Sequence, residues 1–316
     1  MSDASEAVTA PPMPHYGILK GPNGLRAGWR ILIFFAILLP LGYATSTGIE
    51  PLVRHTHAGN FTPLFVLLSY GLFVPPLLLA TWIVGRIEHR SFADYGLPLR
   101  QAFGRRFWQG AAFSFASLTL LLVTMRLVGV FSFGTIMLHG WNSWKYAAAW
   151  AVPMFFGVFL EDFLYRGYFL FTLSKGIGFW PAAVVTSLLM GGIHYFNPGG
   201  HGLGPVTATM YCLVTCLVLR RTGDLWMPLG IHLAWGWGES YFYGLQDAGF
   251  PTVGHLFDAR LHGNPLLTGG AFGPEASIFN VVLLAAWGVF FSLWLRGVRY
   301  PNPAAVQQPQ PSQNVN

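Results

Sequence analysis

Charged residues are scarce in this chain. Asp, Glu, Lys and Arg together make up 9% of its 316 residues, whereas hydrophobic residues make up 53%. A soluble domain usually carries about 25% charged residues, so this composition excludes an ordinary water-facing surface. Aromatic residues are abundant instead, and their side chains suit lipid and its interfaces. The composition predicts an integral membrane protein, and we expect the net charge of +6 to serve membrane topology and not a nucleic-acid partner.

Cysteine is nearly absent as well. Cys212 and Cys216 are four residues apart in an apolar run, so they share one helix face and cannot form a disulfide within that helix. We interpret them as small buried apolar residues. The chain shows no internal repeat and no His-Glu-x-x-His motif. A polar stretch of about thirty residues precedes the first apolar run, which is too long for the start of a cleavable signal peptide.

Eight runs are apolar enough to cross a bilayer, since a span needs roughly 20 apolar residues. Backbone polar groups inside lipid must bond within the segment, and runs of this length and continuity favour helices over barrel strands. We therefore predict an all-α fold, a polytopic transmembrane bundle of about eight helices. The expected helices cover about 28–48, 63–85, 107–130, 146–172, 178–196, 205–221, 226–246 and 276–297.

The basic residues are distributed unevenly between the two sides of this bundle. Cytoplasmic loops are enriched in Lys and Arg, and thirteen of these residues fall on the side that holds both termini, against four on the other. This predicts cytoplasmic termini, as in a bacterial inner-membrane protein. The thirteen are Lys20, Arg26, Arg30, Arg86, Arg90, Arg100, Arg105, Arg106, Lys175, Arg220, Arg221, Arg296 and Arg299.

The expected organisation has a helical core between less informative ends. Composition rich in Pro, Gly, Ala, Gln or Asn predicts disorder at both termini. The expected parts are a disordered N-terminus at 1–25, three helices with their loops at 26–145, a core at 146–246, an external loop at 247–275, a last helix at 276–300 and a disordered tail at 301–316.

Ionisable residues inside the expected spans are the strongest functional signal, because a charge near the bilayer centre costs at least roughly 2.5–3.5 kcal/mol. Asp162 and Arg166 are four residues apart and can form an ion pair on one helix face. Glu161 lies about 100° away around the helix. It remains an acid in an apolar setting, where desolvation should raise its pKa and allow proton exchange near neutral pH. The alternative is that all three form a structural polar cluster.

Two histidines and a second acid follow in later spans. His194 ends the run that contains Gly191 and Gly192, two glycines that allow close approach of another helix. A single histidine at a helix end is often only interfacial or capping. His232 lies one to two turns inside its span. Glu239 follows seven residues later, on the same helix face. The alternative is that Glu239 simply lies at the outer interface.

Three short motifs occur in order in these segments. They read Glu161-Asp162-x-x-x-Arg166, Met190-x-x-x-His194 and His232-x-x-x-Gly236, the last within Trp226-x-Pro228-x-Gly230-x-His232-x-x-Trp235. In order and spacing they resemble the CAAX-processing and bacteriocin-processing (CPBP) intramembrane endopeptidases, also called the Abi or type II CAAX prenyl protease family. Each motif alone is weak, and together they are fairly specific.

The resemblance implies a glutamic peptidase without metal or cofactor. Glu161 is then the base that activates a water, assisted by His194, while His232 and the Asn of the third motif stabilise the oxyanion. Asp162 and Arg166 become a supporting pair. The family's substrates include prenylated CAAX proteins, bacteriocin-type peptides and signalling peptides, so the implied partners are lipid and a membrane-associated protein or peptide.

The chain departs from the family pattern at three positions. Asp162 stands for a second Glu, Met190 for an aromatic residue, and Gly236 for the Asn. The last change removes a donor from the oxyanion site, and losing one such donor typically costs about 10²–10³ in turnover. A water beside Gly236, or the side chain of Glu239, Asn197 or Ser240, is a candidate to replace this Asn in the oxyanion region.

Three other functions stay open on the sequence. Glu161, His194 and His232 are plausible zinc ligands, as in a zinc-dependent membrane protease. Gly236 favours a non-catalytic immunity, scaffold or regulatory protein. Buried acids and histidines can also relay protons in transporters, although the lack of repeats argues against a carrier.

Overall fold

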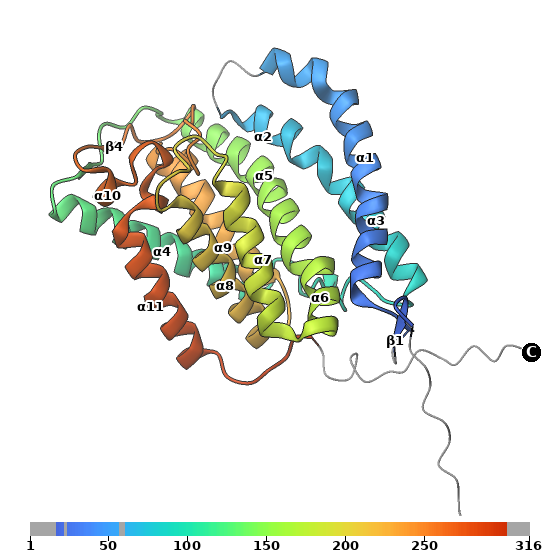
Figure 1. The fold of residues 1–316 in the computed structure, drawn as a ribbon. Helices are drawn as coiled ribbons and strands as arrows, with labels where there is room; N and C mark the ends of the chain where they lie inside the picture. Colours follow the sequence, from blue (N-terminus) through green and yellow to red (C-terminus); the bar gives the residue numbers. More distant parts are fainter. Residues whose placement is uncertain (1–16, 22–23, 57–60, 302–316) are drawn as a thin grey trace, which may run out of the picture.

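The structure is a computed structural model that describes residues 17–21, 24–56 and 61–301. It is a bundle of helices, and the predicted all-α fold of about eight helices is confirmed (Figure 1). Most of the two termini for which we predict disorder lies outside the described residues.

The N-terminal helices form one flank of the bundle (Figure 1). A short antiparallel hairpin of β1 (Lys20–Gly21) and β2 (Gly24–Leu25) precedes α1 (Ala27–Thr56). The second expected span is helical almost throughout. It comprises α2 (Pro63–Ser69), the 3₁₀ turn η1 (Gly71–Phe73) and α3 (Val74–Ile87). Its start follows the usual rule for helix N-termini, with Pro63 in the first turn and the Thr62 hydroxyl accepting from a backbone N–H. A 3₁₀ turn, η2 (Leu99–Gln101), then leads to α4 (Arg105–Leu127).

The middle of the bundle holds the segments that contain the three motifs. Two of these helices pass into a π-helical turn, a local distortion that is frequent at functional sites. The segments are α5 (Trp141–Phe163), the π turn η3 (Leu164–Phe169), α6 (Leu170–Ile177), α7 (Phe179–His194), α8 (Gly204–Thr222), α9 (Trp226–Trp237) and the π turn η4 (Gly238–Tyr243).

The segment after η4 folds back over one end of the bundle. β4 (Arg260–Leu261) pairs antiparallel with β3 (Phe131–Ser132), so that Phe131 faces Leu261. Three short helical turns follow, and α11 (Ile278–Trp294) then forms the flank opposite α1 (Figure 1). The turns are α10 (Pro265–Thr268), η5 (Gly270–Phe272) and η6 (Pro274–Ala276).

Four helical segments are long and apolar enough to cross a membrane: Ala27–Arg54, Pro63–Ile87, Arg105–Leu127 and Trp141–Ile177. Two more helices, α7 and α11, are apolar but shorter. Each of the eight predicted runs coincides with a helical segment, although the fourth helix continues beyond its predicted end at 172. The chain is an integral membrane protein.

Glycines set the closest helix contacts. A Cβ at Gly230 of α9 would overlap the Phe107 carbonyl of α4, and one at Gly191 of α7 would overlap the Thr209 hydroxyl of α8. The prediction of close packing is therefore confirmed for Gly191. It is wrong for Gly192, where an added Cβ would meet nothing within 4 Å, because that residue points away from α8.

Several of the basic residues meet at one end of the bundle. Arg30 at the start of α1 pairs with Glu88 just after α3. Arg106 at the start of α4 pairs with Asp224, which follows α8. Arg299, beyond α11, donates its backbone N–H to the Arg220 carbonyl at 2.9 Å. These contacts place the starts of α1 and α4 near the ends of α3, α8 and α11.

Candidate active site

The acidic motif lies at the junction of α5 and η3. Glu161 and Asp162 belong to the last turn of α5, and Arg166 lies in the π turn that follows. Gly167 in that turn has a non-helical backbone (ψ −112°), and a Cβ there would come within 2.7 Å of the Phe163 ring. The distortion thus depends on glycine directly after the motif arginine.

The Asp162 carboxylate binds two partners. The expected pair with Arg166 is present, and both side chains are completely buried. The same carboxylate oxygen lies 3.0 Å from Nδ1 of His232 on α9. A carboxylate held by Arg166 only accepts, so His232 Nδ1 must carry a proton and donate to it. Arg166, Asp162 and His232 therefore form one chain of contacts between α5 and α9, a link that the sequence did not predict.

This hydrogen bond orients the His232 ring. Nδ1 is engaged with Asp162, and Nε2 lies 3.9 Å from Oε2 of Glu161. The Tyr211 ring packs against His232 with its centroid at 5.1 Å, and the same ring lies 5.5 Å from the Arg166 guanidinium. His232 is consequently held on two sides, with one nitrogen left toward Glu161.

Glu161 is the accessible acid of the pair. Its side chain is 33% exposed, whereas that of Asp162 is 0% exposed. The apolar setting expected for Glu161 is wrong: it opens into a cavity with many polar side chains, because separate helices and a distant loop converge there. This Glu161 cavity is lined by Phe61, Val66, Tyr70, Met154, Gly157, Val158, Glu161, His194, Asn197, His232, Asp247, Ala248, Phe250 and Glu275.

His194 is positioned by the second motif. Its Nδ1 lies 2.8 Å from the Met190 carbonyl, one helical turn earlier, and a carbonyl only accepts, so Nδ1 carries the proton. In the neutral ring Nε2 is then an acceptor. Met190 also meets the first motif, since Arg166 donates to its sulfur at 3.7 Å. The residue that replaces the motif aromatic therefore makes a polar contact besides its packing.

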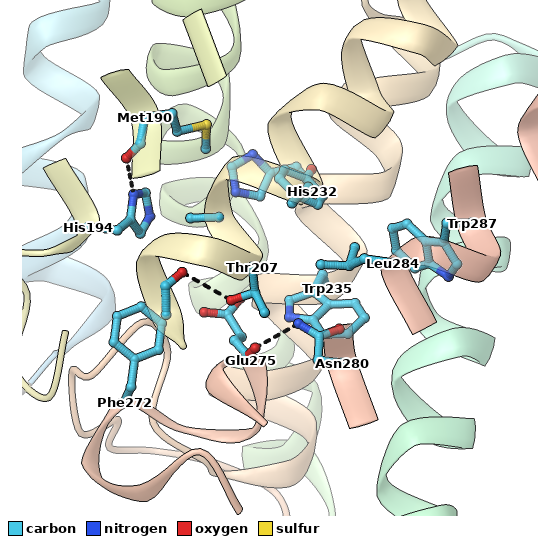
Figure 2. A pocket seen from close by; sticks show the side chains of 13 residues that line it. Met190, His194, Thr207, His232, Trp235, Phe272, Glu275, Asn280, Leu284 and Trp287 are labelled. Carbon is cyan, nitrogen blue, oxygen red and sulfur yellow. Dashed lines mark hydrogen bonds between the residues drawn. The ribbon is translucent and has the colours of Figure 1, made fainter. Parts of the chain in front are cut away.

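A second cavity adjoins the first and shares His194, His232 and Glu275 with it. Figure 2 shows Glu275 between Phe272 and Asn280 on one side of this space, with the imidazole of His194 next to Met190. The other walls are largely apolar and come from α8, α9 and α11. This Trp287 cavity is lined by Met190, His194, Gly204, Thr207, Ala208, Tyr211, His232, Trp235, Phe272, Glu275, Asn280, Leu284 and Trp287.

Three carboxyl groups meet beside these cavities. One oxygen each of Glu239, Asp247 and Glu275 lies within 4.8 Å of the others. Burial, with the Glu275 charge next, raises the pKa of Asp247 to about 7, and burial also raises the pKa of Glu275. Sequence reasoning missed Asp247 and Glu275, because both lie in the loop where an acid is normally solvated. Asp247 follows the third-motif helix closely, which is the one signal that could have pointed to it.

The candidate substitutes for the motif asparagine fall in different places. Asn197 lines the Glu161 cavity, but its amide donates to the Ala248 carbonyl at 3.1 Å. The Ser240 hydroxyl donates to Asp247 at 2.8 Å. Glu239 is completely buried in the carboxyl cluster, and neither of its oxygens has a hydrogen-bond partner among the residues that the structure describes.

The zinc hypothesis requires Glu161, His194 and His232 to converge on one point. Within the described part of the chain, the residues that do come within common ligand distance are Glu239, Asp247 and Glu275 instead. Three carboxylates and no imidazole are ligands of the kind that hard cations prefer, not zinc. Glu161, His194 and His232 instead line one cavity, in which Nε2 of His232 lies 3.9 Å from Oε2 of Glu161.

Comparison with known proteins identifies the central segment. Residues 141–238 match the family model described as type II CAAX prenyl endopeptidase Rce1-like, close to the predicted core at 146–246. Comparison with curated proteins and with solved structures gives no match. The match confirms the resemblance drawn from the three motifs. The segment 141–238 is therefore similar to the type II CAAX prenyl endopeptidases of the Rce1-like kind, which are membrane peptidases.

Proposed function

We propose that this protein hydrolyses a peptide bond in a membrane-associated protein or peptide, with Glu161 as the base. One observation supports this most: Glu161, His194 and His232 come from α5, α7 and α9 and line a single cavity. A hydrolase needs a base, a water and charge stabilisation in one protected place, and these three side chains supply what the reaction requires.

The roles follow from hydrogen-bond capacity. Glu161 accepts a proton from the attacking water. His194, whose Nδ1–H is bonded to the Met190 carbonyl, presents Nε2 as a second acceptor that orients this water. His232 donates Nδ1–H to Asp162, and in its imidazolium form it also donates from Nε2 to the oxyanion. The proton on Glu161 then passes to the leaving amine as the C–N bond breaks, so that Glu161 acts first as a general base and then as a general acid.

Substrate and topology complete the proposal. The Trp287 cavity adjoins the catalytic side chains and offers apolar walls, which suit an apolar side chain or a prenyl group of the substrate. Arg30 and Arg106 lie at one end of the bundle, where each forms an ion pair with an acid, and a gathering of basic residues at one end supports cytoplasmic termini in a bacterial inner membrane.

The test is cleavage of a quenched peptide library that includes prenylated peptides, by purified protein in lipid. Glu161→Gln keeps the shape of the side chain and removes the base, so we expect a loss of about 10²–10⁴ in turnover. Glu50→Gln is the matched control, since Glu50 is 54% exposed on α1 and pairs with Arg54. Equal cleavage by wild type and Glu161→Gln would refute the mechanism.

A non-catalytic role is the second candidate, and Gly236 is the observation that favours it. Under that hypothesis the wild type cleaves none of the library, and the cellular phenotype survives Glu161→Gln. Loss of the phenotype in Glu161→Gln but not in Glu50→Gln would rule it out.

A further inference from the structure

The space beside Gly236 is taken by a side chain from elsewhere. A Cβ built on Gly236 would lie 3.4 Å from Oδ2 of Asp247 and 2.9 Å from the Met154 sulfur. Gly236 is one turn beyond His232 on the same helix face. The carboxyl of Asp247 therefore lies beside the point where a side chain at position 236 would begin, and it lines the same cavity as His232.

The backbone presents Asp247 rigidly. Asp247 and Phe250 exchange two backbone hydrogen bonds of 3.1 and 2.9 Å, which closes a tight turn. Asn197 donates to the Ala248 carbonyl within this turn, and Gly249 donates to the Phe272 carbonyl at 2.7 Å. The turn is thus tied both to the end of α7 and to η5, and Asp247 is fixed in the wall of the Glu161 cavity.

The surroundings keep a proton on this carboxyl group. Glu239, Asp247 and Glu275 crowd within 4.8 Å, and like charges at such distances do not all ionise. The pKa of Asp247, raised to about 7, agrees with this. A protonated carboxyl is a donor as well as an acceptor. The Ser240 hydroxyl donates to Asp247 and so leaves the acid proton of Asp247 free for another acceptor.

We propose that Asp247, as a neutral carboxylic acid, donates the hydrogen bond to the oxyanion that glycine at position 236 cannot donate. This inference rests on the proposed function and assigns a further catalytic residue to the same site. No covalent bond to Asp247 forms or breaks, because its carboxyl group acts only as a hydrogen-bond donor alongside His232.

The inference predicts a specific pH dependence. The donor is present below the raised pKa and is lost as pH rises through about 7, so wild-type turnover should fall above that value. Polar and titratable groups on the elements that surround Asp247 also influence its titration. They are Tyr70 beside α2, Glu161 on α5, His194 on α7, His232 on α9, Glu239 and Ser240 on η4, and Glu275 on η6.

Two substitutions separate donation from structure. Asp247→Ala removes the donor and should lower kcat by about 10²–10³ with little change in KM. Asp247→Asn keeps a donor that does not ionise, so it should retain most of the turnover and lose the fall above neutral pH. Asp258→Ala is the control, an acid of the same loop that pairs with the 73% exposed Arg260. Equal activity of wild type and Asp247→Ala, or equal inactivity of the two Asp247 variants, would overturn the inference.

The double variant Gly236→Asn with Asp247→Ala tests the position itself. It removes the carboxyl group of Asp247 and places an amide at position 236 of α9. The added Cβ would lie 2.9 Å from the Met154 sulfur, so the end of that flexible side chain must move. We expect this variant to recover turnover relative to Asp247→Ala alone. No recovery, in a protein that melts like the wild type, would count against the shared position.

An infrared measurement tests the proton without any substrate. The carbonyl stretch of a protonated carboxyl should be present at about pH 6 and should weaken by about pH 8.5, and Asp247→Asn should remove that change. A spectrum without a band assignable to Asp247 would overturn the proposal. So would stoichiometric binding of added Mg²⁺ or Mn²⁺ that Asp247→Ala abolishes, because the cluster would then be an ionised cation site.

If Glu161→Gln is inactive while Asp247→Ala is active, only this inference fails; if Glu161→Gln is active, the proposed function fails.

Discussion

The buried Asp162 offers the sharpest separation between stability and catalysis. It accepts from Arg166, which is completely buried as Asp162 is, and from the partly exposed His232. Asp162→Asn leaves the Arg166 guanidinium without a counter-ion, and breaking a buried pair in this way costs about 3–5 kcal/mol. For a chain of this size that corresponds to a fall in Tm on the order of 10 °C.

The same substitution should disable His232. An asparagine at position 162 can offer its NH₂ group as well as its oxygen to His232 Nδ1, so the ring loses its fixed orientation and protonation. A catalytic group misplaced by about 1 Å can cost about 10²-fold in rate. We therefore expect Asp162→Asn to lose at least that factor in turnover, beyond any loss of folded protein.

The double variant Asp162→Asn with Arg166→Met distinguishes the two effects. Removing both charges and keeping similar volume restores much of the stability, because buried pairs are often replaced by apolar residues at little net cost. The carboxylate that orients His232 stays absent, so turnover should stay low. The assay is Tm in detergent together with cleavage per folded molecule. A double variant with wild-type turnover would refute the idea that Asp162 acts through His232.

The remaining predictions concern helix packing at glycine. Gly191→Leu should cost about 1–3 kcal/mol, because the new side chain forces α7 away from α8, whereas Gly192→Leu should leave Tm nearly unchanged. Gly230→Ala should destabilise by a similar amount, because its methyl group would overlap a backbone carbonyl of α4. Gly288→Ala is its control, since an added Cβ there meets its nearest neighbour at 3.8 Å. Equal melting of either glycine variant and its control would contradict the packing described above.

The sequence by itself determined the class of the protein and most of its helices. Hydropathy and helix length are local properties, so a chain with 9% charged residues and eight long apolar runs had few alternatives to a helical membrane bundle. The Asp162–Arg166 pair was predictable for the same reason, since positions four apart on a helix always meet. The three motifs likewise pointed to the family that the match over 141–238 confirms.

Only the tertiary structure decided which side chains from different segments meet. The hydrogen bond between Asp162 and His232 depends on how α5 and α9 are rotated against each other. The polar lining around Glu161 and the close approach at Gly191 but not at Gly192 depend on the same rotations. The place of Asp247 beside Gly236 depends on a loop whose path is set by backbone contacts to two distant turns. Helix rotation and loop path follow from the packing of the whole bundle, and no local pattern of residues encodes them.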